Sequence, residues 1–346
     1  MSQTIPDNQT ALDGQQAGEL AGGKRSALEQ ICVSIVDDLA ATERLLLAEQ
    51  TGASEFVSKM LAQTPLMGGK RMRPVLVFLA GGCVGGIQEK HHALAAAIEL
   101  VHTATLVHDD IRDGAETRRH VSTVNSIWDN TTSVLVGDYL FTQSFEVAAR
   151  SGIIDAISKI AVASSRVCEG EMLQNAAIGN FELNETEYFE IIRLKTAELC
   201  KCACGLGVLA SGGSEEEIQS FENFGNSIGI AFQIVDDVLD LVGHEGKVGK
   251  TLGTDLANKK LTLPLIHCLR ESDVENRDTL LKQLKSETPN VSDVLSLLAN
   301  TNSIEYARTK ASEYATEAMT FAGSQDDSEH AIGLRRLAEF VLKRTH

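Results

Sequence analysis

Proline is almost absent from the middle of this chain, and that constrains the fold more than any other feature. The chain has 346 residues and five prolines, and none lies between Pro74 and Pro264. Because proline breaks a helix interior, a long stretch without it that is rich in Ala, Leu, Glu and Ile favours long helices. Apolar residues at helical spacing, such as Leu94, Ile98 and Val101, support this. We therefore expect an all-α fold.

Glycine-rich and polar segments divide the chain into expected elements. We expect a disordered tail over residues 1–24 and one domain over residues 25–346. A polar connection is expected over residues 117–123 and a loop over residues 244–260. The segments expected to be helical are residues 76–113 with interruptions near Gly81-Gly82 and Gly85-Gly86, residues 125–150, a helix running to about Leu209 with Asn184 as its N-cap, and residues 219–241.

The charge of the chain excludes several classes of protein. The net charge is −17 and the isoelectric point is ≈ 5.0, whereas a nucleic-acid-binding protein normally has a basic face. The same charge would be repelled by an anionic membrane surface. No apolar run approaches the ~18 residues of a membrane-spanning helix, and residues 1–23 lack the apolar core of a signal peptide. We expect a cytoplasmic enzyme with no transmembrane segment and no nucleic-acid partner.

The chain has seven cysteines, three of them close together as Cys200, Cys202 and Cys204. On a helix, Cys202 lies on roughly the opposite face from the other two, so the three cannot converge on one metal ion. In a chain without a secretory signal, we expect reduced packing residues rather than zinc ligands or disulfides.

Two aspartate clusters of the same form stand out in this helical chain. Residues four apart on a helix share a face, so the first and last aspartates of each cluster point the same way. Like charges at that spacing weaken a helix. Clustered carboxylates suit Mg²⁺, which proteins usually hold with one or two carboxylates plus substrate phosphates. We therefore expect both clusters to bind metal. The first aspartate cluster is Asp109, Asp110 and Asp113, and the second is Asp236, Asp237 and Asp240.

Basic residues accompany both clusters. A glycine-rich loop with the sequence GGKRMRP spans residues 68–74, Arg118 and Arg119 follow the first cluster, and Lys250 and Lys260 follow the second. Fixed cations and helix N-termini are common sites for phosphate groups. Any one of these motifs is more often solvated surface charge. Together they indicate a site where Mg²⁺ and basic residues share a diphosphate.

From about Ser26 to the C-terminus, the chain resembles the trans-isoprenyl diphosphate synthases, also called polyprenyl synthetases. The matching segments, in order, are GGKRMRP, ELVHTATLVHDDIRD, TRR, VGDYLF, EGEMLQ, LKTAEL, GIAFQIVDDVLD and GKTLGTDLANKKLTLP. The resemblance implies a single-domain bundle of long helices around a central substrate cavity. It also implies condensation of isopentenyl diphosphate with an allylic diphosphate, farnesyl or geranylgeranyl, by a homodimer with about three Mg²⁺ ions per active site.

The resemblance also implies roles for individual residues. The metal ligands would be Asp109, Asp113, Asp236 and Asp240, and the catalytic residues would be these with Asp110, Asp237, Lys195 and Lys250. The isopentenyl diphosphate site would be Lys70, Arg73, His102 and Arg119. The allylic diphosphate site would be Arg118, Lys195, Thr196, Gln233, Lys250 and Lys260. His102 precedes Asp109 by two helical turns, so both should face one cavity.

At three positions the chain departs from the family pattern. Arg112 lies inside the first cluster, where an apolar or acidic residue is usual, and we expect it to be solvated because it is on a different face from Asp113. His120 replaces the glycine expected after the paired arginines, and Lys259 replaces the glycine expected before Lys260. These departures bear on the geometry of the two loops and not on the reaction class.

The residues before the first cluster bear on product length. The growing product should run down the helix below Asp109, where short-chain members of the family place bulky aromatic residues. Here the positions hold Ala104 and Thr105, both small, which favours a long-chain product, from heptaprenyl to decaprenyl and of the octaprenyl type. Candidates for closing a deeper cavity are Phe141, Phe145 and Met172, although ordinary core packing explains each equally well.

Three alternative functions remain. A short-chain geranylgeranyl or farnesyl diphosphate synthase shares every motif and differs at residues 104 and 105. A class I terpene cyclase shares the aspartate-rich helix but binds no acceptor diphosphate, so Lys70, Arg73 and the second cluster argue against it. A non-catalytic subunit of a heteromeric synthase should lack the acidic clusters, and both are intact here.

Overall fold

The computed structural model describes residues 27–67, 69–118, 121–243 and 253–344, and this part of the chain is almost entirely helical. The result confirms the expected all-α class. A short hairpin pairs Arg118 with Val121. The elements in chain order are α1 (Ala27–Ile31), η1 (Val33–Ile35), α2 (Val36–Thr51), α3 (Glu55–Leu61), α4 (Met72–Val84), α5 (Glu89–Arg112), β1 (Thr117–Arg118), β2 (Val121–Ser122), α6 (Val124–Ile127), α7 (Asn130–Ala149), α8 (Ile154–Ala177), α9 (Glu185–Ile192), η2 (Arg193–Ala197), α10 (Glu198–Ala210), α11 (Glu215–Val242), α13 (Thr254–Ala257), α14 (Leu263–Glu271), α15 (Val274–Lys285), α16 (Val291–Asn300), α17 (Ser303–Ser324) and α18 (Glu329–Arg344).

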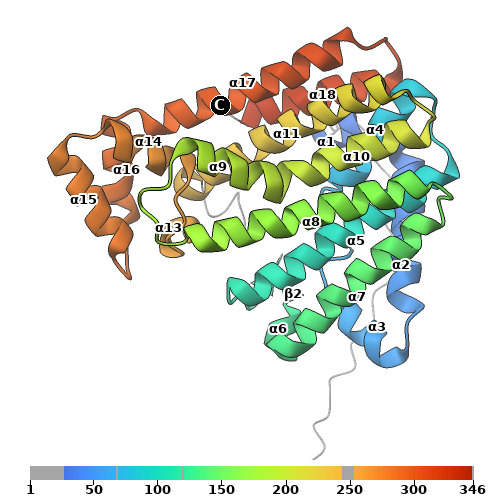
Figure 1. Cartoon of the computed structure of the whole chain (residues 1–346), viewed down its shortest axis with the longest axis horizontal. Coiled ribbons are helices and arrows are strands. Elements are labelled where there is room, and N and C mark those ends of the chain that lie inside the picture. The colour runs from blue at the N-terminus through green and yellow to red at the C-terminus, as the bar shows by residue number, and fades with distance from the viewer. Residues whose placement is uncertain (1–26, 68, 119–120, 244–252, 345–346) are drawn as a thin grey trace, which may run out of the picture.

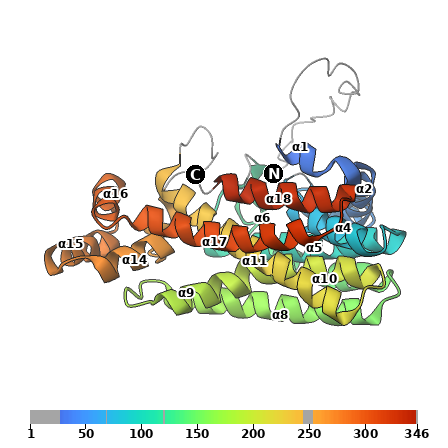
Figure 2. The same cartoon turned by 90° about the horizontal axis from the view of Figure 1, so that it is seen from above.

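The long helices run side by side as a bundle (Figures 1 and 2). Helix α5 packs against α7, α10 packs against both α4 and α11, and α11 packs against α17. The short helices α14 to α16 gather at one end of the molecule (Figure 1). None of the described helices combines the length and the apolar character that crossing a membrane requires.

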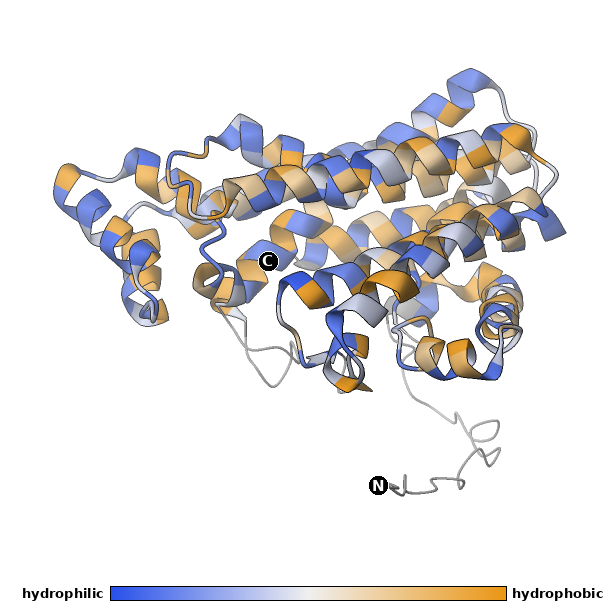
Figure 3. Cartoon of the chain, turned by 60° about the horizontal axis from the view of Figure 1, so that its bottom comes forward, coloured by the Kyte–Doolittle hydropathy of each residue, from blue (hydrophilic) through white to orange (hydrophobic). Residues whose placement is uncertain are grey.

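Apolar and polar residues alternate around most helices (Figure 3), and the apolar sides form the core. The core consists of two clusters of buried side chains, and α11 contributes to both: Ile228 belongs to one and Ile234 to the other. Because one continuous helix runs through both clusters, the second aspartate cluster at its C-terminal end is fixed to the whole bundle.

The break expected near Gly81-Gly82 is wrong, because both residues lie inside α4. A Cβ atom at Gly81 would lie 2.5 Å from Nε2 of His91 and 2.9 Å from the carbonyl oxygen of Gly207. Gly81 therefore serves close packing against α5 and α10. The second expected break is correct: α4 ends at Val84 with Gly85 as its C-cap, and Gly86 has a φ of 83°.

The helix expected to begin after Asn184 is present, and the N-cap prediction is confirmed. The Asn184 side chain accepts a hydrogen bond from the backbone N–H of Glu187, and the Glu187 carboxylate accepts one from the Asn184 backbone. The sequence pattern did not show that this helix contains one π-helical turn, η2, between α9 and α10. Such turns are rare and often lie at functional sites, and η2 contains Lys195 and Thr196.

Cys200, Cys202 and Cys204 are buried in α10 as free thiols. Burial raises the pKa of Cys202 to about 12, which fits the expected role of packing residues.

Candidate active site

Both aspartate clusters lie where a long helix ends. The first occupies the last turn and the C-cap of α5, and the second occupies the last two turns of α11. A helix C-terminus carries partial negative charge, so carboxylates there are destabilising unless cations lie nearby. One aspartate is partly compensated by backbone donors, because Asp240 accepts hydrogen bonds from the N–H groups of Thr254 (3.3 Å) and Asp255 (3.0 Å).

The middle aspartate of each cluster is buried and tied to the protein. Asp110 is 3% exposed and accepts a 2.7 Å hydrogen bond from Nε of Arg118. Asp237 is 5% exposed and accepts bonds from Tyr188 (2.6 Å) and Gln233 (2.8 Å). Burial raises the pKa of both carboxyl groups, that of Asp237 to about 8. The first and last aspartates of each cluster are partly exposed, which suits them better to an external cation.

Two lysines connect the clusters. The Nζ of Lys195, in η2, lies 3.7 Å from Oδ2 of Asp109. The next residue, Thr196, donates a 2.7 Å hydrogen bond to Gln233, which in turn donates to Asp237. The Nζ of Lys260 lies 3.5 Å from Oδ1 of Asp113.

Lys260 is linked to the second cluster through Asp255. Its Nζ lies 3.9 Å from Oδ1 of Asp255, whose backbone N–H donates to Asp240. Through these lysines, carboxylates from sequence regions far apart lie around one site. The contacts of Lys195 and Lys260 thus link the C-terminal end of α5 to the C-terminal end of α11.

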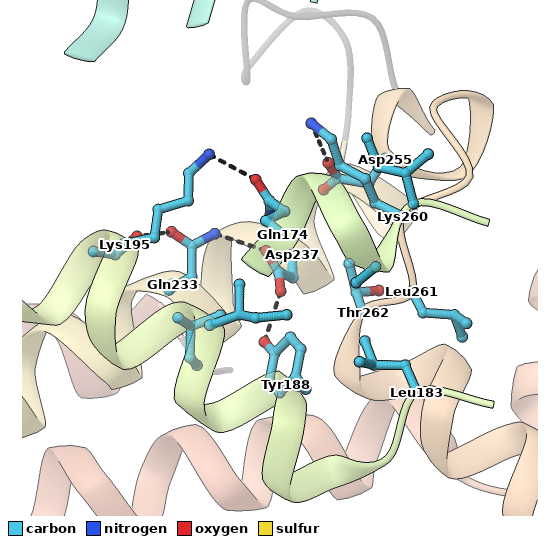
Figure 4. Close-up of a pocket in the computed structure, with 15 residues that line it drawn as sticks. Gln174, Leu183, Tyr188, Lys195, Gln233, Asp237, Asp255, Lys260, Leu261 and Thr262 are labelled. Atoms are coloured by element: carbon cyan, nitrogen blue, oxygen red, sulfur yellow. Dashed lines mark hydrogen bonds and ion pairs between the residues drawn. The ribbon is translucent and has the colours of Figure 1, made fainter. Parts of the chain in front are cut away.

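A pocket opens beside the second cluster (Figure 4). Its apolar lining includes Ile191 and Ile192 of α9 and Leu183, which lies just before that helix. The hydroxyl of Thr262 in this pocket is buried and has no hydrogen-bond partner among the described residues. The polar side chains lining the pocket are Gln174, Tyr188, Lys195, Thr196, Gln233, Asp237, Asp255, Lys260 and Thr262.

The glycine-rich loop leads into α4. Lys70 is exposed just before the helix, and Arg73 lies in its first turn. The Nε of Arg73 is buried without a hydrogen-bond partner in the described structure. A buried unpaired donor is costly, so this atom suits an anionic ligand. His102 lies on the adjacent helix α5.

Arg71 anchors this loop, a role that the sequence did not indicate. Its buried guanidinium binds Glu43 on α2 (2.5 and 3.0 Å), Glu99 on α5 (2.8 Å) and the carbonyl oxygen of Leu66 (2.6 Å). Its backbone has a φ of 49°, in the left-handed region. Two helices thus fix the loop between Lys70 and Arg73.

The expectation that Arg112 is solvated is wrong. Its side chain is 24% exposed and contacts Asp109 (3.0 Å), Asp113 (3.5 Å) and Glu171 on α8. An arginine side chain is long enough to reach around the helix end to Asp113, so the difference in helix face did not keep the two groups apart.

Lys259 takes the conformation that the expected glycine would favour. Its φ is 55°, and its Nζ lies 2.6 Å from Glu287. Glycine, Asn and Asp adopt the left-handed region most readily. Lysine in place of the expected glycine therefore preserves the turn at some conformational cost. Arg119, His120 and Lys250 lie outside the described residues.

A family model for polyprenyl synthetases matches residues 54–301. The chain belongs to the polyprenyl synthetase family. It is 31% identical to the octaprenyl diphosphate synthase of Escherichia coli over 92% of this chain and 99% of that protein. It is 35% identical to a short chain isoprenyl diphosphate synthase of Methanothermobacter thermautotrophicus, over 81% of this chain and 87% of that protein.

A solved polyprenyl synthase of Caulobacter crescentus, in complex with calcium and isoprenyl diphosphate, has a TM-score of 0.86 and 29% identity. The match covers 93% of this chain and 100% of that one. Membership of the polyprenyl synthetase family makes this chain a prenyl diphosphate synthase, which is a transferase.

The carboxylates of the site suit a Mg²⁺ ion that is also bound by the phosphate oxygens of a diphosphate. Within the described ranges, no three His, Cys, Asp or Glu side chains form a ready-made metal cage. Mg²⁺ is usually held by one or two carboxylates with phosphate and water oxygens. The partly exposed carboxylates of Asp109, Asp113, Asp236 and Asp240 match that incomplete arrangement.

The residues expected to bear on product length differ in their burial and contacts. Ala104 is fully buried in the core, and Thr105 donates a 2.7 Å hydrogen bond to the carbonyl oxygen of His102. Phe141 and Phe145 on α7 pack against the core. Met172 is 66% exposed, so the suggestion that it closes a deep cavity within one chain is wrong.

Sequence reasoning missed three residues that hold the site together. Tyr188 binds Asp237, and Glu171 and Gln174 bind Lys195 at 2.8 and 2.7 Å. Glu171 and Gln174 belong to the matching segment EGEMLQ, so their presence in the site could have been anticipated. Tyr188 lies two helical turns before Lys195 and carried no signal of its own.

Proposed function

We propose that this chain is a Mg²⁺-dependent trans-prenyltransferase that joins isopentenyl diphosphate to farnesyl or geranylgeranyl diphosphate and releases a long-chain all-trans polyprenyl diphosphate. The observation that supports the proposal most directly is the connection of both aspartate clusters through Lys195 and Lys260. Carboxylates for metal and ammonium groups for phosphate then surround one site, which a diphosphate leaving group requires.

In this proposal the allylic carbon–oxygen bond breaks and diphosphate leaves. The isopentenyl double bond attacks the allylic cation and forms the new carbon–carbon bond. A proton is then lost to the released diphosphate, so no protein base is required. Bound Mg²⁺, about three ions as the family uses, would act as a Lewis acid toward the leaving group.

The chain's own residues supply the remaining stabilisation. Lys195 and Lys260, with Arg118 and Lys250, would provide fixed positive charge for the departing diphosphate. Isopentenyl diphosphate, the second substrate, would bind to a separate set of basic residues: Lys70, Arg73, His102 and Arg119. The apolar side chains below the site would exclude water, which could otherwise capture the cation.

Several observations support the finer points of the proposal. The small residues Ala104 and Thr105 favour a long product over the short-chain alternative, and relatives of both kinds match this chain. The homodimer that the family pattern implies would cover exposed apolar side chains such as Leu135 on α7 and Ile154 on α8, which are 63% and 81% exposed. The second cluster and the loop at residues 69–74 favour a synthase over a terpene cyclase.

The proposal is tested by incubating purified protein with labelled isopentenyl diphosphate, farnesyl diphosphate and Mg²⁺. Chromatography of the products should reveal chains longer than geranylgeranyl. Asp109→Ala or Asp236→Ala should lower kcat by several orders of magnitude, since each removes an expected metal ligand. Asp278→Ala, an exposed aspartate on α15, serves as the control and should leave the rate unchanged.

Two results would count against the proposal in different ways. Farnesyl or geranylgeranyl diphosphate as the sole product would remove the long-chain claim and leave the reaction class intact. Near-normal activity of both aspartate variants would remove the metal-ligand assignment.

A further inference from the structure

Arg112 joins the two expected metal ligands of the first aspartate cluster to a third carboxylate. Its Nη2 lies 3.0 Å from Oδ1 of Asp109, and its Nε lies 3.5 Å from Oδ1 of Asp113. Its Nη1 donates to Oε2 of Glu171 on α8. An arginine cannot lose its proton in a protein. A divalent cation that binds both Asp109 and Asp113 must therefore compete with the Arg112 guanidinium for their carboxylate oxygens.

Glu171 holds both cations that contact Asp109. Besides Arg112, it accepts from Nζ of Lys195, at 2.8 Å from Oε1 and 2.9 Å from Oε2. Its place is fixed by close packing, because a Cβ atom on the preceding Gly170 would lie 2.6 Å from the backbone nitrogen of Lys195. Glu171 is thus a fixed hydrogen-bond acceptor beside the cluster. It can remain paired with Arg112 and Lys195 when the aspartates bind a metal ion.

We propose that the pair Arg112 and Glu171 sets the affinity of the first aspartate cluster for divalent metal. Arg112 competes with the metal for Asp109 and Asp113, and Glu171 favours the metal by drawing Arg112 away. Both are positioning residues in this account. The inference rests on the proposed function only in that it takes Asp109 and Asp113 as metal ligands.

A purely structural role for the pair predicts a different result. If the pair only fastened α5 to α8, its removal would lower thermal stability and leave the metal affinity of the folded protein unchanged. Competition instead predicts opposite signs, with tighter metal binding when Arg112 is removed and weaker binding when Glu171 is neutralised. No single loss of stability produces both signs.

The test is a titration of the whole chain with Mg²⁺ at constant ionic strength, with and without inorganic pyrophosphate, followed by calorimetry and by the shift in Tm. We expect Arg112→Leu to lower the apparent Kd for Mg²⁺ about fivefold or more, a typical size for coupling between two binding events. Glu171→Gln should raise the Kd by a similar factor. In the Arg112→Leu background, Glu171→Gln should have a clearly smaller effect.

Matched controls separate competition from a general change of charge. Arg193→Leu removes a partly exposed arginine of η2 that binds Glu190 at 2.6 Å. Glu169→Gln neutralises an exposed carboxylate on the same helix as Glu171. Each control should shift the Kd less than twofold. Arg112→Gln keeps a hydrogen-bonding group without charge and should repeat the sign of Arg112→Leu if the leucine variant folds poorly.

Three results would overturn the inference: an unchanged or higher Kd in both Arg112 variants, a lower Kd in Glu171→Gln, or strictly additive effects in the double variant. Failure of the proposed function appears separately. If the unaltered chain neither binds Mg²⁺ nor transfers prenyl groups, that proposal fails; if it does both while the Arg112 variants bind Mg²⁺ normally, only this inference fails.

Discussion

At the scale of single residues, the hydrogen-bond partners of the buried His91 fix its charge state. His91 is completely buried where α4, α5 and α10 meet. Its Nδ1 accepts a hydrogen bond from the backbone N–H of Gln88, and its Nε2 donates to the carbonyl oxygen of Gly207. That pattern requires the neutral ring, and burial lowers the pKa of His91 below its ordinary value of 6.5.

This histidine should make stability depend on pH. Below about pH 6.5 the unfolded chain gains a proton that the folded protein does not, so the free energy of unfolding falls as pH decreases. His91→Gln should lower stability at pH 7.5 by about 1–3 kcal/mol, because buried partners lose their hydrogen bonds. It should also reduce the further loss between pH 7 and pH 5. Urea unfolding at both pH values measures this, and an equal loss in variant and parent would contradict it.

At the scale of elements, the contact between α8 and η2 positions Lys195, which we propose as a catalytic residue. Gly170 lets the two backbones approach so closely that a Cβ atom would lie 2.8 Å from Cβ of Leu194, as well as against Lys195. The π-helical turn places Lys195 toward Asp109 and Thr196 toward Gln233. Neither contact can be read from helical periodicity, because periodicity assumes a regular helix.

Gly170→Ala should therefore affect both stability and activity. The added methyl group must push η2 away, which typically costs about 1–3 kcal/mol for overpacking, and the shift of Lys195 should lower kcat at least tenfold. Gly323→Ala on α17 is the matched control, since nothing lies within 4 Å of its new Cβ, and alanine there should stabilise the helix by about 0.5–1 kcal/mol. Thermal unfolding and the prenyl transfer assay give both values, and unchanged kcat in Gly170→Ala would argue against the positioning role.

At the scale of the whole molecule, the product path that we propose below Asp109 would be bounded by several helices together. Ala104 on α5 is completely buried, and α5 packs extensively against α7. Phe141 of α7 lies with its ring 6.0 Å from that of His108, one helical turn after Ala104. The length of the product should therefore depend on how α5 and α7 pack and not on any one helix.

Ala104→Phe should shorten the product to geranylgeranyl diphosphate or less, because the larger side chain would block the path that we propose for the growing chain below Asp109. The rate of the first condensation with isopentenyl diphosphate should stay close to that of the parent, because only later additions meet the new side chain. Chromatography of dephosphorylated products measures both. Ala148→Phe, a buried alanine at the far end of α7, is the control for overpacking alone. An unchanged product from Ala104→Phe would mean that the chain grows elsewhere.

The sequence by itself determined the helical class, the family and most of the residues that meet at the site. The helical class follows from proline avoidance and helical spacing, which are local patterns set by backbone geometry. The family and the site residues follow from the resemblance of several ordered segments to the polyprenyl synthetases. It could not show that Arg112 is paired with Glu171 or that Arg71 is clamped between α2 and α5. Only the tertiary structure decided those contacts, because they join helices far apart in the chain, and long side chains find partners that helix-face arguments do not anticipate.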